Sequence, residues 1–185
     1  MTLASLARIT GPGLVLRLVQ PDDAAFVHAL RSDPALNAHL SAVTGTVDDQ
    51  RRWIDAYKPR EAALRELYYV IERRDGRPCG LVRLYDIGEE SFTWGSWVLG
   101  AGKPPKAALE SAVLSLGIGF EQLDLPLARI EVRADNAHAI AFYRRFGMAE
   151  DGGDAVHRMY RYDRAQYRAA RDGHLRLLAL SKVPS

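Results

Sequence analysis

Residues 129–148 read RIEVRADNAHAIAFYRRFGM, and their hydrophobic period changes partway from that of a strand to that of a helix. The Leu, Ile and Val residues between Leu127 and Val132 predict the strand. Asn136 is a suitable N-cap for the helix, and Gly147 is a suitable residue to end it. One helical face carries Ala139, Phe142, Tyr143 and Phe146. The segment therefore predicts a strand that leads into a short helix with a buried aromatic face.

The periods of the flanking sequence predict a mixed α/β chain. Strands are expected at 14–19, 67–72, 79–85, 91–99, 127–132 and 157–162, and helices at about 22–30, 46–59, 106–123, 136–146 and 164–180. The Asp75-Gly76 pair and the turn at 88–90 join three of these strands into an antiparallel meander. The predicted order β-α-α-β-β-β-α-β-α-β gives a mostly antiparallel central sheet, with one parallel crossover, flanked by helices.

The chain contains no linker long enough to separate two domains. We therefore expect a single domain over residues 1–185. Its core is expected at about 14–162, and a C-terminal helical extension at about 164–180.

The third strand of the meander, 91–99, contains two tryptophans. Strict alternation places one set of side chains on one face, Phe92, Trp94, Ser96 and Val98, and the other set on the opposite face, Thr93, Gly95, Trp97 and Leu99. The tryptophans could form an aromatic wall for a sugar, a base or a peptide, or could belong to the core. The sequence leaves both interpretations open.

Composition limits the classes of protein to which the chain can belong. The chain has 25 Lys and Arg residues against 23 Asp and Glu residues, a net charge of +2. Charges this close to balance argue against a strongly basic surface for binding nucleic acid. The single cysteine, Cys79, excludes an intrachain disulfide and favours a reducing compartment. Zinc-site spacing, a bilayer-length apolar run and signal-peptide features are missing from the sequence. We expect a soluble cytoplasmic protein that needs no metal and binds neither membrane nor nucleic acid.

The glycine-rich turn at 100–106, GAGKPPK, invites a phosphate-loop interpretation. A Walker loop needs glycine where Trp97 stands, and Ser or Thr where Pro104 stands, which excludes nucleoside triphosphate hydrolysis. A helix is expected to begin at about 106–108, and its free N–H groups could bind a phosphate with help from the two lysines of the turn. An ordinary strand-to-helix connection is the alternative.

Residues 136–148 resemble a motif of the GCN5-related N-acetyltransferase (GNAT) superfamily, N-x-x-A-x-x-x-Y-x-x-x-G-F, which closes the acyl-CoA site. The matching positions are Asn136, Ala139, Tyr143 and Gly147, with Met148 in place of the usual Phe. The preceding run EVR at 131–133 resembles the strand of ribosomal-protein N-terminal acetyltransferases. More loosely, WGSW at 94–97 and GKPPK at 102–106 resemble acetyltransferases of surface-polysaccharide pathways that act on nucleotide-linked amino sugars. The element order is also that of the superfamily, so the resemblance covers roughly 14–162.

This resemblance implies an acetyl-CoA-dependent N-acetyltransferase, with acetyl-CoA as co-substrate and direct attack by a primary amine in a ternary complex. Tyr143 would donate a proton to the departing thiolate. Glu131 would help to deprotonate the amine, directly or through water, and an ion pair of Glu131 with Arg129 or Arg133 is the alternative.

The resemblance also implies how acetyl-CoA would be held. Backbone N–H groups around residues 97–99, where family members separate two strands, would hold the thioester carbonyl and the pantetheine arm. The family's pyrophosphate loop, Q/R-x-x-G-x-G/A, corresponds to residues 103–108, where Lys106 replaces a glycine and two prolines remove N–H donors. The expected acetyl-CoA contacts are Trp97, Val98, Leu99, Lys103, Lys106, Ala107, Ala108, Asn136 and Tyr143.

Two other classes of function are alternatives to an enzyme. The altered pyrophosphate loop suggests a non-catalytic acyl-CoA-binding or regulatory module on the same fold. The Arg-rich C-terminal segment suggests an interaction domain that docks a partner or forms a homodimer. For the enzyme, the acceptor is a small-molecule or peptide amine, either a nucleotide-linked amino sugar or a protein N-terminal amine. His138 in the motif helix could contact substrate, although exposed helix histidines seldom do.

Overall fold

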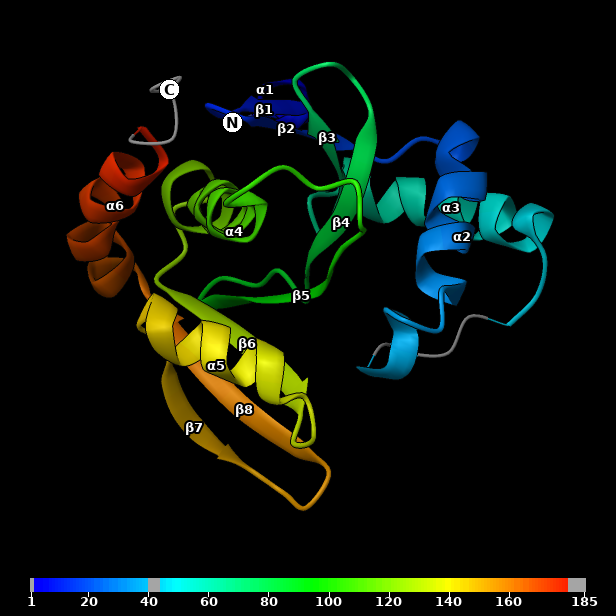
Figure 1. Ribbon diagram of the computed structural model, residues 1–185. Coiled ribbons are helices and arrows are strands. Elements are labelled where there is room, and N and C mark those ends of the chain that lie inside the picture. The colour runs from blue at the N-terminus through cyan, green and yellow to red at the C-terminus, as the bar shows by residue number, and fades with distance from the viewer. Residues whose placement is uncertain (1, 40–43, 180–185) are drawn as a thin grey trace, which may run out of the picture.

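The computed structural model describes residues 2–39 and 44–179, which form an eight-stranded sheet of order β1-β2-β3-β4-β5-β6-β8-β7 (Figure 1). The strands are β1 (Arg8–Thr10), β2 (Leu14–Leu18), β3 (Leu67–Arg73), β4 (Pro78–Tyr85), β5 (Ser91–Leu99), β6 (Leu127–Arg133), β7 (Ala149–Gly153) and β8 (His157–Asp163). Neighbouring strands are antiparallel except β5 and β6, which are parallel. The predicted fold class is therefore confirmed.

Helices cover both faces of this sheet. They are α1 (Leu3–Leu6), α2 (Ala24–Ser32), α3 (Val47–Ala62), α4 (Ala107–Gly117), α5 (Ala137–Phe146) and α6 (Arg164–Ala179), with short turns η1 (Pro21–Asp23), η2 (Asn37–His39) and η3 (Ile118–Gln122). The α2–α3 pair lies on the opposite side of the sheet from α4 and α6 (Figure 1). Across the described ranges, none of these helices combines the length and apolar character needed to cross a membrane.

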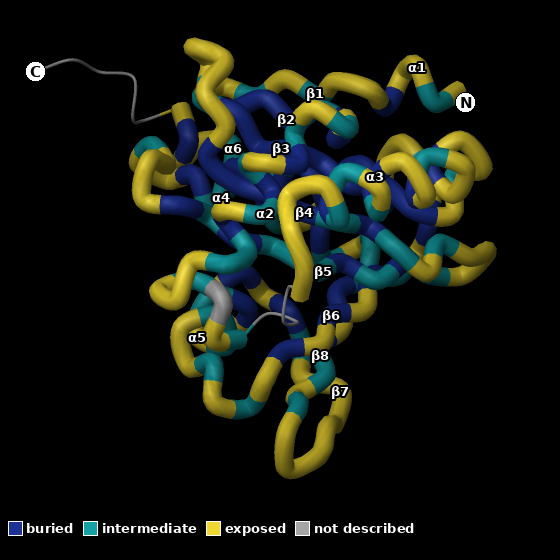
Figure 2. Tube along the Cα trace, turned by 90° about the vertical axis from the view of Figure 1, so that its right-hand side faces the viewer, coloured by how far each residue is buried: buried dark blue, intermediate teal, exposed yellow. Residues whose placement is uncertain are grey.

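Two buried clusters correspond to the two helical layers. The smaller cluster joins α2 and α3 to β3 and β4 through residues such as Val27, Ile54 and Val70. The larger cluster lies on the other face and joins α4, α5 and α6 to the strands. The buried positions gather along the central strands, whereas β7 at the edge is exposed for most of its length (Figure 2).

Four local features differ from the predictions. Helix α1 and strands β1 and β7 were not predicted, because segments of three to five residues are too short to display a period. Helix α3 also continues past Pro59 to Ala62 instead of stopping near the proline. Side-chain bonds hold its last turn, since the hydroxyl of Tyr57 and the ammonium of Lys58 each donate to Glu61 at 2.8 Å.

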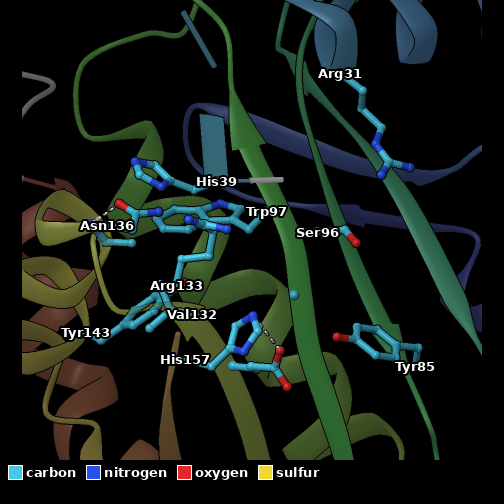
Figure 3. Close-up of a pocket in the computed structure, with 13 residues that line it drawn as sticks. Arg31, His39, Tyr85, Ser96, Trp97, Val132, Arg133, Asn136, Tyr143 and His157 are labelled. Carbon is cyan, nitrogen blue, oxygen red and sulfur yellow. Dashed lines mark hydrogen bonds and ion pairs between the residues drawn. The ribbon is translucent and has the colours of Figure 1, made fainter. Parts of the chain in front are cut away.

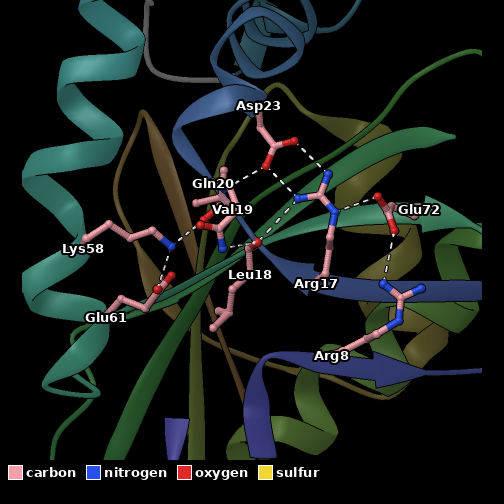
Figure 4. A network of polar contacts seen from close by, with 9 residues as sticks. All are labelled: Arg8, Arg17, Leu18, Val19, Gln20, Asp23, Lys58, Glu61 and Glu72. Atoms are coloured by element: carbon pink, nitrogen blue, oxygen red, sulfur yellow. Dashed lines mark hydrogen bonds and ion pairs between the residues drawn. The ribbon is translucent and has the colours of Figure 1, made fainter. Parts of the chain in front are cut away.

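An ionic network anchors η1 and α2 to the sheet (Figure 4). The guanidinium of Arg17 on β2 donates two hydrogen bonds of 2.7 Å to the carboxylate of Asp23 and a third of 2.7 Å to Glu72 on β3. Lys58 of α3 donates to the carbonyl of Val19 at 2.6 Å, just beyond β2. The helical layer on this face is therefore attached to β2 and β3 by polar bonds as well as by apolar packing.

We predict that Asp23→Asn destabilises the protein in a pH-dependent way. Burial opposes ionisation of the Asp23 carboxyl, but hydrogen bonds from Arg17 and from the N–H of Gln20 outweigh burial and lower its pKa. The resulting stability is present above the ordinary carboxyl pKa, about 3.9, and is lost as the pH falls through the lower folded value. The substitution should lower the free energy of unfolding by about 1–3 kcal/mol at pH 7.

Urea denaturation at several pH values measures this effect, and the gap to wild type should narrow below pH ~4. Asp22→Asn is the matched control, because the Asp22 side chain is 96% exposed and its ion pair with Arg51 should contribute little. A loss of the same size at every pH would contradict the assigned role of the Asp23 carboxylate.

Candidate active site

The parallel pairing between β5 and β6 ends after three residue pairs, the last of which is Thr93 with Arg129. Strand β5 nevertheless continues to Leu99 and β6 to Arg133. Beyond Thr93, the β6-facing edge of β5 has no strand partner in the described part of the chain. Unpaired backbone N–H and C=O groups of β5 therefore face the opening between the two strands.

A β-bulge interrupts β5 at Ser96, whose φ of 47° lies in the left-handed region. Ser96 and Trp97 together stand opposite the single residue Val82 of β4. The extra residue shifts the alternation of side chains after Gly95. The predicted strict alternation over 91–99 is therefore wrong beyond Gly95, because a bulge depends on pairing with the neighbouring strand.

The bulge places Trp94 and Trp97 on the same face of the sheet. Their ring centroids are 5.1 Å apart. The Nε1–H of Trp94 donates to Ser115 Oγ at 2.8 Å, and that of Trp97 donates to Ser111 Oγ at 3.1 Å. Trp94 is fully buried, whereas Trp97 is partly exposed. Trp94 is thus a core residue, and Trp97 is available at the site.

A pocket of about 310 Å³ lies at the opening between β5 and β6 (Figure 3). Three elements supply most of its wall: β5 contributes Gly95, Ser96 and Trp97, β6 contributes Glu131, Val132 and Arg133, and the start and body of α5 contribute Asn136, Ala139 and Tyr143. Arg31, His39, Tyr85 and His157 complete the lining. The pocket therefore reaches from the α5 side of the sheet to the side that carries α2.

The structure brings four of the predicted site residues together in this pocket, Trp97, Glu131, Asn136 and Tyr143. The other predicted acetyl-CoA contacts lie outside its lining: Val98, Leu99, Lys103, Lys106, Ala107 and Ala108. The Val98 side chain is buried in the cluster of α2 and α3, and Leu99 packs against the larger cluster. A contact of Val98 with a ligand at the opening would therefore involve its backbone, whereas the Leu99 side chain is partly exposed.

Tyr143 lies at the wall of the pocket with its ring buried among aromatic side chains. Its centroid is 5.6 Å from that of Tyr160 and 6.1 Å from that of Trp94. Its hydroxyl makes no hydrogen bond to a side chain or backbone group within residues 2–39 and 44–179. Burial, followed by the proximity of Tyr85 and Tyr160, raises the pKa of the phenol. Tyr143 is therefore protonated at neutral pH and can act as a proton donor.

Local capping determines how α5 presents Tyr143 to the pocket. The side-chain oxygen of Asn136 accepts the N–H of Ala139 at 3.1 Å, which confirms the predicted N-cap. At the other end Gly147 adopts φ 95°, a left-handed conformation that favours glycine, and Met148 N–H donates to the carbonyl of Tyr143 at 3.0 Å. Helix α5 therefore ends where the sequence motif predicted.

Glu131 has a different partner from the two that the sequence suggested. The guanidinium of Arg133 is occupied by Asp135, at 3.1 Å and 2.9 Å, and Arg129 reaches Ser91 Oγ at 3.4 Å. The carboxylate of Glu131 instead lies 3.6 Å from Nε2 of His157 on β8. The suggested ion pair with Arg129 or Arg133 is therefore wrong.

The glycine-rich turn leads into α4 as predicted, with Lys106 in a left-handed conformation (φ 61°) directly before the helix. The N–H groups of Ala108 and Leu109 make no hydrogen bond to any described residue. The ammonium of Lys106 donates to the carbonyl of Leu177 in α6, whereas Lys103 is exposed. The start of α4 therefore offers two free backbone N–H donors, and the exposed Lys103 is nearby in the sequence.

Nine residues of the pocket lining were not predicted as site residues, and four of them come from outside the segments of β5, β6 and α5: Arg31, His39, Tyr85 and His157. Arg31 and His39 belong to the first 66 residues, where the sequence displays no interpretable motif. His157 was recognised only as the start of a strand. The pairing of β8 with β6 would have been the signal, because it places His157 directly opposite Arg133.

Comparison with known proteins establishes the family. The model of the acetyltransferase (GNAT) domain family, Acetyltransf_3, matches residues 13–149. Among solved structures, the apo form of FdhC, described as a nucleotide-linked sugar GNAT, is 34% identical, with 91% of this chain and 97% of that chain covered and a TM-score of 0.84. No curated protein matches the chain. The chain belongs to the GNAT acetyltransferase family.

Two more distant structures share the fold. A spermidine N-acetyltransferase from Vibrio cholerae, in complex with CoA and spermine, is 20% identical over 84% of this chain and 98% of that chain, with a TM-score of 0.73. A GCN5-related N-acetyltransferase from Brucella melitensis is 16% identical over 96% of this chain and 88% of that chain, with a TM-score of 0.79.

We predict that Asn136→Ala lowers the free energy of unfolding by about 1 kcal/mol, because the N-cap acceptor of α5 is lost. Asn136→Asp keeps a side-chain oxygen at the same place and should retain stability close to that of wild type. Urea denaturation monitored by circular dichroism measures both variants. Equal stability of the Ala and Asp variants would contradict the capping role.

Proposed function

We propose that the protein is an acetyl-CoA-dependent N-acetyltransferase that acetylates a primary amine by direct attack in a ternary complex. The observation that carries this proposal is the position of Tyr143. Its phenol is buried, protonated and located at the wall of a pocket that opens where β5 and β6 separate. Membership of the GNAT family supports the same chemistry.

The residues at the opening fit acetyl-CoA, which supplies the acyl thioester when bound. The unpaired edge of β5 at residues 97–99 offers backbone donors for the carbonyl oxygen and the pantetheine amides. The free N–H groups of Ala108 and Leu109, with the charge of Lys103, offer a site for the pyrophosphate. The ammonium of Lys106 would contribute to this site only after its hydrogen bond to the carbonyl of Leu177 is broken.

Two side chains divide the proton transfers between them. Glu131 faces the pocket and helps to remove a proton from the acceptor ammonium, directly or through water. Tyr143 donates its phenolic proton to the sulfur as the carbon–sulfur bond breaks. No covalent intermediate on the protein is required, because the amine attacks the thioester directly.

The arginines of the pocket favour an acceptor that carries an anionic group besides its amine. Two arginines, Arg31 and Arg133, line the pocket, and a guanidinium group binds a phosphate or carboxylate through paired hydrogen bonds. Glu131 is the acidic residue among the lining residues. Asp135 offsets part of the charge of Arg133. We therefore propose an amine attached to an anionic molecule, such as the nucleotide-linked amino sugar suggested by the description of FdhC, ahead of a polyamine.

A thiol-release assay with acetyl-CoA tests this proposal. The acceptor panel contains a nucleoside-diphosphate-linked amino sugar, a peptide with a free N-terminus, and spermidine. We expect turnover with the sugar and at least tenfold lower kcat/KM with spermidine, because spermidine has no anionic group to bind the two arginines of the pocket. Binding of CoA without thiol release for any amine would instead support a non-catalytic module.

We predict that Tyr143→Phe lowers kcat by at least tenfold without changing the affinity for CoA, because the proton donor to the sulfur is lost. Tyr162→Phe is the matched control. Tyr162 is equally buried, its hydroxyl has no hydrogen-bond partner among the described residues, and it lies outside the pocket lining. Steady-state kinetics and calorimetry measure both variants. An unchanged kcat for Tyr143→Phe would exclude Tyr143 as the acid.

A further inference from the structure

We propose that His157 and Glu131 form a proton relay that takes up the proton lost by the acceptor amine, an inference that rests on the proposed N-acetyltransferase activity. The sequence motif includes Glu131 but not His157. The structure joins them because β8 returns antiparallel beside β6.

The strand register places both side chains on one face of the sheet. Arg133 pairs with His157 and Glu131 pairs with Met159, so Glu131 and His157 are diagonal neighbours. Their closest atoms, Oε1 and Nε2, are 3.6 Å apart. Both residues line the pocket that Tyr143 also lines (Figure 3). The pair is thus directly accessible to a molecule bound there.

The hairpin before β8 holds the backbone of His157 in place. Oδ1 of Asp154 accepts the backbone N–H groups of Val156 and His157, each at 2.7 Å, and the N–H of Asp154 donates to the carbonyl of His157 at 2.8 Å. The same Oδ1 lies 3.9 Å from Nδ1 of the His157 ring. The imidazole therefore has one carboxylate near each ring nitrogen.

The other titratable or charged groups near the pair include Arg133, His39 and Tyr85, of which the Tyr85 phenol on β4 interacts electrostatically with Glu131. Arg133, on β6 opposite His157, is bound by both oxygens of Asp135, and His39 lies 3.2 Å from the same carboxylate. Within the described residues, the ion-pair partner of Glu131 is His157. A carboxylate whose partner can titrate can pass on a proton, whereas a carboxylate held by arginine cannot.

A histidine suits this task better than a carboxylate alone. An alkylammonium has a pKa of about 10 and a glutamate carboxyl about 4.3, so direct transfer between them is strongly uphill. Imidazole, at about 6.5, lies between the two values and exchanges protons with water near neutral pH. General base catalysis is most effective when the base titrates near the working pH.

The proton balance of the reaction is then complete. The ammonium gives one proton to the Glu131–His157 pair, which releases it to solvent. The neutral amine forms the new carbon–nitrogen bond, and the carbon–sulfur bond breaks. The thiolate takes the phenolic proton of Tyr143, and the second proton of the nitrogen restores the phenol. The products are the amide, the free thiol and one proton in solution.

The test compares the pH profile of kcat/KM for His157→Gln with that of wild type, using acetyl-CoA and the nucleoside-diphosphate-linked amino sugar. We expect a loss of about 10–100-fold at pH 7, because general base catalysis of this kind contributes about two orders of magnitude or more. The loss should shrink to within about threefold near pH 9.5, where the free amine is abundant. His138→Gln is the matched control, since His138 is exposed on α5 and outside the pocket lining.

A double-variant cycle tests whether the two residues act as one unit. If they form a relay, Glu131→Gln with His157→Gln should be no slower than the slower single variant. Multiplicative losses, or a loss in His157→Gln of equal size at every pH, would overturn the relay while leaving the enzyme proposal intact. Absence of turnover by wild type with every amine of the panel would overturn both proposals.

Discussion

The early end of the β5–β6 pairing is the constraint on which the rest of the site depends. Parallel neighbours usually satisfy each other's backbone groups, yet here the pairing stops at Thr93 while β5 runs on to Leu99. The bulge at Ser96 reshapes the strand at this point, and a Cβ at Gly95 would lie only 3.2 Å from the ring of Tyr85. A sheet that would otherwise be continuous therefore has an opening near its centre, with unpaired backbone groups along one edge.

The same bulge positions α4 relative to the opening. It turns Trp94 and Trp97 to one face, where both indoles donate hydrogen bonds to serines of α4. These bonds hold the helix against the bulged strand. The free N–H groups of Ala108 and Leu109 lie at the start of the same helix. The packing of α4 against β5 thus depends on two tryptophans that differ in exposure but lie on the same face of the sheet.

Strand β6 separates the proposed acid from the proposed base. Its alternation buries Ile130 and Val132 against the larger core and leaves Glu131 and Arg133 on the opposite face. The helix that follows then presents Tyr143 from the core side. Burial keeps the phenol protonated, while Glu131 remains half exposed beside His157. Strand β6 and helix α5 thus supply two environments, one suited to donating a proton and the other suited to accepting a proton.

The mixed α/β fold class, the strand–helix unit around Asn136 and Tyr143, and the start of α4 could all be predicted from the amino-acid sequence, because caps and hydrophobic periods are properties of neighbouring residues. The shared face of Trp94 and Trp97 and the pairing of His157 with Glu131 became visible only in the folded chain. These outcomes depend on strand register and on a bulge, which arise from pairing between segments far apart in the chain. The spacing of residues along the chain does not specify such pairing. The motif therefore identified the proposed acid, Tyr143, but not His157 as the partner of the proposed base, Glu131.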